Sequence, residues 1–187
     1  GTDYKDANYG NTAQFRTENW NYTPWSDIKS FLKFHLWLDD FFELSQADLL
    51  IKGNYHWNSG TTNESEFNKV TSSWNEDIIT WNASPSTNTT IIESLANTAS
   101  NNANATVDMT SFCEYWQSDN TQNYGIFFRL EDFDDDVNAR QYYHSPNATT
   151  SANRPEWTFK VDLRHLSDPY HCNPVYAGME RRLTGAS

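Results

Sequence analysis

Short apolar runs separated by turn residues recur along most of the chain. Residues 30–38 (SFLKFHLWL) alternate for part of their length, with Phe31 and Lys33 facing opposite to Leu32 and Phe34. Further runs of strand length, rich in β-branched or aromatic residues, are ADLLIKG, DIITW, TIIESLA, YGIFFRL and WTFKVDL. Turn signals such as NYGN, KGN, NSGTTN and NASPSTN lie between them. This pattern predicts an all-β antiparallel sandwich.

One segment departs from the strand pattern. Residues 109–118 place four apolar side chains at helical spacing: Met109, Phe112, Cys113 and Trp116. Thr110 or Ser111 could cap such a helix, so one short helix is expected here. The low-complexity stretch NTASNNANATVD, residues 97–108, is expected to be a solvated loop.

The stretch VTSSWNEDIITWNASP, residues 70–85, raises the question of what its two tryptophans do. As a strand, DIITW would alternate, with Ile79 and Trp81 pointing opposite to Ile78. Trp74 is expected to plug the corner between two strands, where a buried indole N–H would need a partner. A sugar-binding platform is the alternative, but this pattern favours core packing for both tryptophans.

Composition narrows the class of protein. A chain of 187 residues is most simply one domain. Abundant Asn, Ser and Thr with 16% aromatic residues is common in secreted β-rich domains. The net charge of −12 argues against nucleic acid and anionic membrane surfaces. The same negative charge argues against a polyanionic polysaccharide as a ligand, unless a local basic patch or a bound cation offsets the repulsion. No stretch reaches the apolar length of a membrane span, so membrane insertion is not expected.

N-glycosylation sequons also favour a secreted protein. Six are present, at Asn21, Asn63, Asn82, Asn88, Asn104 and Asn147. Composition alone would give roughly four. A proline follows the sequons at Asn21 and Asn82, which makes these two poorer acceptors. We therefore expect a glycosylated exterior on an extracellular or cell-surface protein.

The chain has two cysteines, Cys113 and Cys172. In an oxidising compartment they would form one disulfide that closes a loop of about 60 residues and contributes about 4 kcal/mol. The alternative is two buried free thiols. A catalytic cysteine is not expected, because nothing in TSFCEYW suggests an activated thiolate.

Seven segments resemble a known family in their order and spacing. They are NYGN, IKSFLKFHLWL, QADLLI, FNKVTSSWNEDIITWNASPS, VDMTSFCEYWQ, NYGIFFRLED and RPEWTFKVDL. The family is the DNRLRE-type module, also called the disaggregatase-related domain, which is counted among the carbohydrate-binding modules. The resemblance covers about residues 4–163, and VTSSWNEDIITWNASP is its most specific part. It implies an antiparallel β-sandwich of jelly-roll type on secreted or surface proteins, usually without catalytic activity of its own.

The two ends of the chain depart from that family. Members usually carry a full apolar strand before the NYG turn, whereas here only GTDYKDA precedes it. Residues 164–187 are expected to be an extension beyond a sandwich formed by residues 1–163. These features favour terminal segments that engage neighbouring copies by strand addition at a sheet edge. The alternative is an extension that wraps around its own domain.

Aromatic residues in polar, turn-like contexts are the candidates for stacking on a sugar ring. They are Trp20, Tyr22, Trp25, Tyr55 and Trp57. A flat ring presents an apolar face to the C–H side of a pyranose, while nearby Asn and Asp side chains bind hydroxyl groups. The alternative is that these rings cover loops or face a neighbouring subunit.

An acidic run is the candidate metal site. It contains Glu131, Asp132, Asp134, Asp135 and Asp136. Carboxylates suit Ca²⁺, but the spacing does not match an EF-hand, and such a run is more often a solvated turn. No other metal or cofactor is expected. G-x-S-x-G, H-E-x-x-H and phosphate-loop motifs are absent from the sequence, so no enzyme is expected, although a glycosidase carboxylate pair stays open.

Two functions follow from these features. The first is a non-enzymatic extracellular structural subunit that assembles with copies of itself into a glycosylated filament or matrix. The second is a carbohydrate-binding module that recognises an extracellular polysaccharide. The terminal segments favour the first, and the family resemblance with the aromatic residues favours the second.

Overall fold

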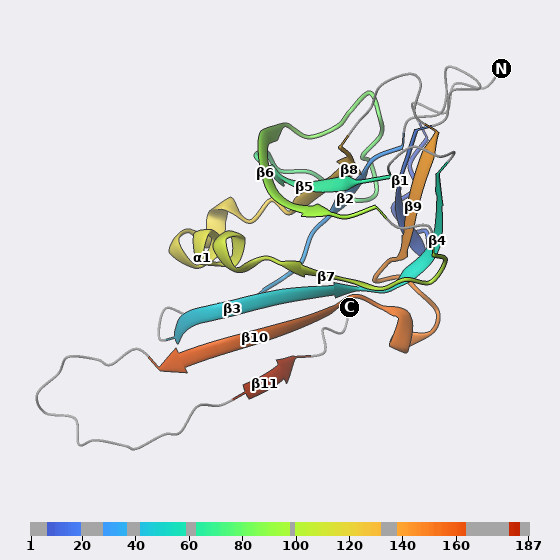
Figure 1. The fold of residues 1–187 in the computed structure, drawn as a ribbon. Helices are drawn as coiled ribbons and strands as arrows, with labels where there is room; N and C mark the ends of the chain where they lie inside the picture. The colour runs from blue at the N-terminus through green and yellow to red at the C-terminus, as the bar shows by residue number, and fades with distance from the viewer. Residues whose placement is uncertain are drawn as a thin grey trace, which may run out of the picture.

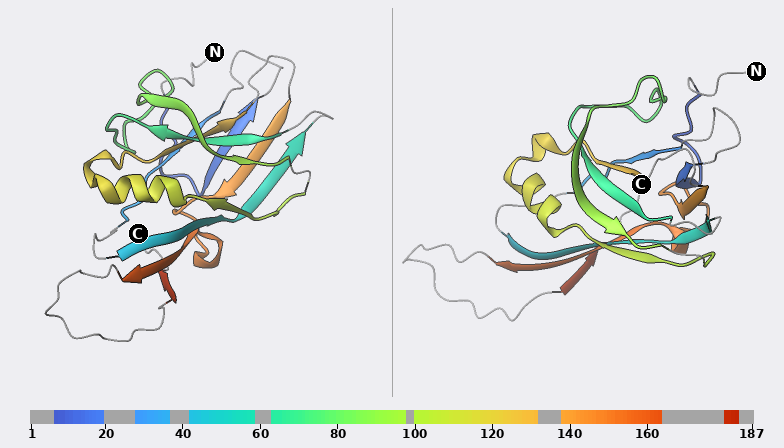
Figure 2. Two further views of the ribbon diagram at one scale, coloured as in Figure 1. Left: turned by 60° about the vertical axis from the view of Figure 1, so that its left-hand side comes forward. Right: turned by 45° about the horizontal axis from the view of Figure 1, so that its top comes forward.

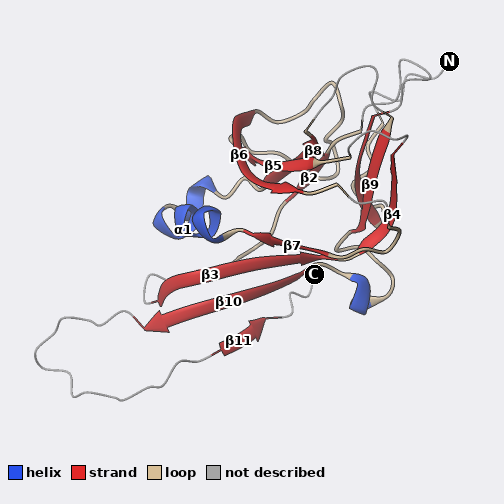
Figure 3. Ribbon diagram, viewed as in Figure 1, coloured by secondary structure: helices blue, strands red, loops and turns tan. Residues whose placement is uncertain are grey.

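A computed structural model of the chain describes residues 7–19, 28–36, 42–58, 63–97, 100–131, 138–163 and 180–183. Figures 1 and 3 show an all-β protein with one α-helix, as the sequence predicts. The strands in these ranges are β1 (Gln14–Asn19), β2 (Ser30–Leu32), β3 (Phe42–Ile51), β4 (Gly53–Asn58), β5 (Ser65–Val70), β6 (Thr87–Leu95), β7 (Ala105–Asp108), β8 (Ile126–Leu130), β9 (Ala139–His144), β10 (Glu156–Leu163) and β11 (Glu180–Leu183). The helices are α1 (Thr110–Ser118) and the 3₁₀ turns η2 (Asn120–Gln122) and η3 (Ser151–Asn153).

The strands form three antiparallel sheets, in the orders β11-β10-β3-β7, β2-β8-β5-β6 and β1-β9-β4. In Figure 1 the sheet with β3 and β10 lies below the sheet with β5 and β8. The sheet β1-β9-β4 lies on the right, and α1 lies on the left. The turned views of Figure 2 show the same layers from two other sides. The two larger sheets are the layers of the sandwich.

The chain passes from one sheet to another between β3 and β4. β3 pairs with β10, whereas β4, which is separated from β3 by Lys52 alone, pairs with β9. Gly53 lies at this bend, and the register with β9 shifts between Gly53 and Tyr55. A Cβ atom on Gly53 would lie 2.1 Å from the carbonyl oxygen of Ala103. The bend therefore requires a residue without a side chain.

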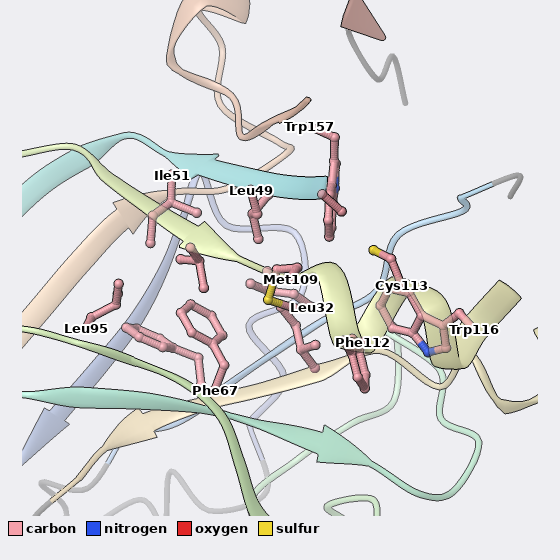
Figure 4. Close-up of a cluster of buried hydrophobic side chains, with 14 of the residues drawn as sticks. Leu32, Leu49, Ile51, Phe67, Leu95, Met109, Phe112, Cys113, Trp116 and Trp157 are labelled. Carbon is pink, nitrogen blue, oxygen red and sulfur yellow. The ribbon is translucent and has the colours of Figure 1, made fainter. Parts of the chain in front are cut away.

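The core lies between the sheets (Figure 4). β3 contributes Leu49 and Ile51, and β5 contributes Phe67; all three are fully buried. Even-numbered residues of β8, such as Phe128, point into this core, where Phe128 stacks on Phe67 at 4.8 Å between ring centroids. Phe127, on the same strand, belongs to the opposite face. Successive side chains of β8 thus alternate between its two faces, and both Phe127 and Phe128 are buried.

Helix α1 lies where the sequence predicts it, and Phe112, Cys113 and Trp116 are its buried residues. Its start differs from the expectation, because neither Thr110 nor Ser111 caps it. Instead, Asp108 accepts hydrogen bonds from the Thr110 backbone nitrogen (2.9 Å) and hydroxyl (2.6 Å). These bonds lower the pKa of Asp108. Of the helices in the described ranges, none is long and apolar enough to cross a bilayer.

Three predicted segments differ from the structure. The strand expected over residues 30–38 is short, because β2 ends at Leu32 and the chain is irregular to residue 36. The solvated loop expected over residues 97–108 includes β7, whose Val107 is buried against β3. DIITW is not a strand: it lies in the loop between β5 and β6. Asn75 causes this, because its carbonyl oxygen accepts the backbone N–H groups of Ile78 (3.3 Å) and Ile79 (3.1 Å).

The last described strand belongs to the expected C-terminal extension. β11 pairs with β10 of the same chain, with Trp157 opposite Leu183 and Lys160 opposite Glu180. This agrees with the alternative in which the extension wraps around its own domain. Residues 164–179 and 184–187 lie outside the described ranges.

Candidate functional site

A cleft of about 340 Å³ lies on the outer face of the sheet β2-β8-β5-β6. It is lined by Lys29, Phe31, Trp81, Pro85, Thr87, Phe127 and Arg129. The strands β2, β8 and β6 supply its floor, and residues 71–86, here named the β5–β6 loop, supply Trp81 and Pro85. The VTSSWNEDIITWNASP stretch thus forms one wall of the cleft.

Local hydrogen bonds give the β5–β6 loop its shape. At its base, the Thr71 backbone nitrogen donates to the Ser86 carbonyl oxygen (2.8 Å). Near its tip, Asn75 Oδ1 accepts the backbone nitrogen of Asp77 (2.9 Å), the turn typical of Asn. After Trp81, the Ser84 hydroxyl donates to the Trp81 carbonyl oxygen (2.7 Å). The loop therefore has a defined backbone although much of its surface is exposed.

The two tryptophans of this loop have different roles. The Trp74 indole nitrogen donates to the Tyr124 carbonyl oxygen at 2.6 Å, and its ring lies 6.0 Å from that of Phe31. Trp74 thus has the partner that the sequence argument required. The core position expected for Trp81 is wrong, because 38% of its surface is exposed. Trp81 lies in a turn rather than a strand, so no strand alternation directs it inward.

Aromatic rings form the floor and one wall of the cleft. Phe31 and Phe127, opposite one another on β2 and β8, stack with 4.9 Å between ring centroids. Lys29 Nζ lies 4.1 Å from the ring centroid of Trp81 and 5.7 Å from that of Phe127. Both distances suit cation–π contacts.

Of the described residues, two cations and no carboxylate line the cleft. Arg129 pairs through Nε with the carboxylate of Glu66, a buried residue that lies opposite it on the neighbouring strand β5. Burial, and secondarily the nearby charge of Arg129, lowers the pKa of Lys29. Among the described residues, no carboxylate forms an ion pair with Lys29. The site therefore presents the positive charge of Lys29 beside aromatic rings, with Arg129 partly compensated by Glu66 and the Thr87 hydroxyl as a neutral polar group.

The stacking candidates from the sequence lie elsewhere. Tyr55 and Trp57 are half-buried on β4, in the sheet β1-β9-β4. The Tyr55 ring lies 5.5 Å from that of Tyr142, and Trp57 lies 5.9 Å from the guanidinium of Arg140. These rings pack along their own sheet and do not contribute to the cleft. Trp20, Tyr22 and Trp25 lie outside the described residues.

The predicted glycosylation sites differ in exposure. Asn82, Asn88, Asn104 and Asn147 are exposed, and their occupancy stays a prediction. Asn63 is fully buried, and its amide nitrogen donates to the Arg140 carbonyl oxygen (3.4 Å). Because a glycan would attach to that nitrogen, burial makes Asn63 a poor acceptor in the folded chain. Asn21 lies outside the described residues.

Cys113 is a free thiol that is fully buried in the core cluster (Figure 4). Burial, with a smaller contribution from the charge of Asp108, raises its pKa to about 12. A thiol in this state is unreactive. Cys172, the expected disulfide partner, lies outside the described residues, so the pairing stays a prediction.

The acidic run is mostly outside the described ranges. Glu131 is exposed, and the Asp132, Asp134, Asp135 and Asp136 positions are not described. Within the part of the chain that the structure describes, no group of three or more His, Cys, Asp or Glu residues is placed to hold a metal ion. The calcium site therefore stays untested.

The sequence argument favoured a core position for Trp81, with a sugar-binding platform as the alternative, and missed Lys29 and Arg129 as site residues. A signal for Trp81 is present, because WNASP places it directly before a turn-forming Asn82 and close to Pro85. No comparable signal marks Lys29 or Arg129. They meet only because antiparallel pairing brings the start of β2 beside β8.

Comparison with known protein families matches residues 1–160 to carbohydrate-binding module family 96. A comparison with curated proteins gives no match. The family match confirms the wider expectation of a carbohydrate-binding-module-like domain, a class that is generally non-catalytic. It extends over most of the chain and includes the strands and the loop that form the cleft. This chain therefore belongs to carbohydrate-binding module family 96.

Proposed function

We propose that the chain binds an extracellular polysaccharide in the cleft, and that this polysaccharide carries acidic groups. The observation that carries the proposal is the position of Lys29 Nζ, 4.1 Å from the ring of the exposed Trp81. The face of an indole can receive the C–H side of a pyranose. An ammonium group beside it can form a charge-assisted hydrogen bond with a carboxylate or sulfate on the same sugar.

The charge of the cleft supports an acidic ligand. The whole chain carries a net charge of −12, which would repel a polyanion at long range. Among the residues that the structure describes, however, the cleft is lined by Lys29 and Arg129 and by no acidic side chain. At about 0.1 M salt, charges are screened beyond about 10 Å, so the local cations determine the interaction at contact.

The size of the cleft supports a short segment of a polymer. Its volume of about 340 Å³ lies near the lower end of the range for small-ligand sites, about 300–1,000 Å³. Phe31 and Phe127 give its floor an aromatic part, and in the described part of the chain no carboxylate pair that could hydrolyse a glycosidic bond lines it. We therefore propose binding without catalysis. The DNRLRE-type assignment, the extracellular location and the glycosylated exterior belong to the same proposal.

The first experiment compares acidic polysaccharides with neutral counterparts of the same backbone. Polygalacturonate and its fully methyl-esterified form are a suitable first pair, followed by other uronate and sulfated polymers. We expect retention on the acidic member of at least one pair in affinity gel electrophoresis, with titration calorimetry on its oligomers. Equal binding to charged and neutral members would contradict the acidic preference.

Variants of the chain locate the site. Trp81→Ala and Lys29→Met should each weaken binding about tenfold, because each removes a contact of about 1 kcal/mol or more. Trp57→Ala is the matched control, since Trp57 lies on β4 outside the cleft. Loss of binding in Trp57→Ala with full binding in Trp81→Ala would show that the cleft is not the site.

Self-assembly through the terminal segments is an untested prediction and not our conclusion. The one described part of the extension, β11, pairs with β10 of its own chain. This pairing does not favour donation of the extension to a neighbour.

A further inference from the structure

The two motifs NYGN and VTSSWNEDIITWNASP, 62 positions apart between Asn8 and Val70, meet in the structure. The side-chain nitrogen of Asn8 donates to the carbonyl oxygen of Glu76 (2.6 Å) and to that of Ile79 (2.7 Å). Both acceptors belong to the β5–β6 loop. One side chain of the NYGN turn therefore bonds twice to the loop that carries Trp81.

The turn and the loop also approach closely through their backbones. A Cβ atom on Gly10 would lie 2.6 Å from Cγ of Glu76 and 2.7 Å from its carbonyl oxygen. A glycine at this position is needed for the approach, because even an alanine methyl group would meet the Glu76 backbone. Asn8 and Gly10 thus contact the same part of the loop by two different means.

The NYGN turn is itself fixed to the rest of the fold. Asn8 Oδ1 accepts the Gly10 backbone nitrogen (3.1 Å), which closes the turn internally. On its other side, the Asn147 side chain donates to the Gly10 carbonyl oxygen (3.1 Å) and the Ser145 hydroxyl donates to the Thr12 carbonyl oxygen (2.6 Å). Ser145 follows directly after β9. The turn therefore connects the β5–β6 loop to the sheet β1-β9-β4.

Packing alone would not fix the loop near Trp81. Ile78 is 69% exposed, so its side chain does not anchor the tip in the core. Ile79, whose carbonyl accepts from Asn8, is two residues from Trp81, a separation of at most about 7 Å between Cα atoms. Holding this carbonyl limits how far the Trp81 backbone can move relative to Lys29.

We propose that the NYGN turn braces the β5–β6 loop and that Asn8 is a positioning residue for Trp81. The brace lowers the conformational entropy that the loop would lose when a saccharide binds, which raises affinity without a direct contact. As far as it concerns ligand affinity, this inference rests on the proposed function.

The test uses the full chain and the variant Asn8→Asp. This substitution keeps the oxygen that accepts from Gly10 but removes both donors to the loop. Gly10→Ala is a second disruption that leaves Asn8 intact. The matched control is Gln117→Glu. Gln117 lies on α1, away from the cleft, and its amide nitrogen donates to the Phe42 carbonyl oxygen (2.9 Å), a donor that the substitution removes. Measurements are the affinity for the acidic oligosaccharide chosen above, hydrogen exchange of residues 76–83, and the thermal midpoint.

We expect Asn8→Asp and Gly10→Ala to weaken binding about tenfold and to speed exchange in residues 76–83. Gln117→Glu should lower the thermal midpoint but leave both the affinity and the exchange of residues 76–83 unchanged. Wild-type affinity and exchange in Asn8→Asp, or an equal loss of affinity in Gln117→Glu, would overturn the brace. If the wild-type chain bound no saccharide, the proposed function would fail, and exchange in residues 76–83 would still decide whether the brace exists.

Discussion

Lys29 is held over two aromatic rings, in a position where its charge is only partly solvated. Burial and the charge of Arg129 both lower its pKa from the ordinary value of 10.5. An anion bound between the two cations would reduce their repulsion and favour protonated Lys29. Ligand binding and protonation of this residue are therefore linked.

This linkage predicts how binding depends on pH. An acidic ligand prefers charged Lys29, so affinity should be constant well below the pKa of Lys29 in the free protein. Affinity should fall as pH rises through that pKa, which is below 10.5. Titration calorimetry from pH 7 to pH 10 on a uronate oligomer measures the decline.

Lys29→Arg is the control, because its guanidinium stays charged throughout this range. It should bind at pH 7 and show no decline up to pH 10. Tyr142 does not interfere, since burial together with Glu18 raises its pKa to about 12. An identical decline in Lys29→Arg would mean that a different group titrates.

Single residues also show what could be predicted from the sequence. The Trp74 indole has the hydrogen-bond partner that the sequence argument required, the Tyr124 carbonyl oxygen. The exposure of Trp81 was not predicted, since a local turn replaced the strand that would have directed it inward. The candidates Tyr55 and Trp57 have the right chemistry, but only the fold shows that they pack on a different sheet.

At the scale of elements, strand-length runs rich in β-branched and aromatic residues predicted several strands. β6, β8 and β10 lie where TIIESLA, YGIFFRL and WTFKVDL predict strands. DIITW failed because two isoleucines and a tryptophan fit a short strand as well as a turn. The preceding Asn75 decided the outcome through its hydrogen bonds. Short apolar runs are ambiguous in this way.

The bend between β3 and β4 depends on one residue. We expect Gly53→Ala to lower the free energy of unfolding by about 1–3 kcal/mol, because its Cβ atom would overlap the Ala103 carbonyl, 2.1 Å away. Chemical denaturation measures the change. Thr158→Ala, at an exposed position of β10, is the control and should change stability by less than about 0.5 kcal/mol. An unchanged Gly53→Ala would mean that the backbone near Ala103 moves freely.

At the scale of the whole molecule, the arrangement of the sheets could not be predicted. β1 pairs with β9, which places Arg16 opposite Tyr142, and β3 pairs with β10. Such long-range pairing depends on how all apolar faces are buried together. The cleft has the same origin, since its floor combines β2, β6 and β8 from different parts of the chain. A family resemblance could predict a sandwich, but not the pair of cations on its surface.

The contrast between a net charge of −12 and a basic cleft predicts an unusual salt dependence. At about 0.01 M salt the screening length is about 30 Å, so the whole chain should repel an acidic oligosaccharide and slow its association. At about 0.15 M the length is about 8 Å, and mainly Lys29 and Arg129 should act on the bound ligand. Association should therefore accelerate several-fold between these concentrations, whereas still higher salt should speed dissociation.

Surface plasmon resonance measures the association and dissociation rates separately. Lys29→Met should keep the salt-dependent rise of the association rate and lose much of the salt-dependent rise of the dissociation rate. Association that slows steadily with added salt would show that the cleft, and not the net charge, governs the approach.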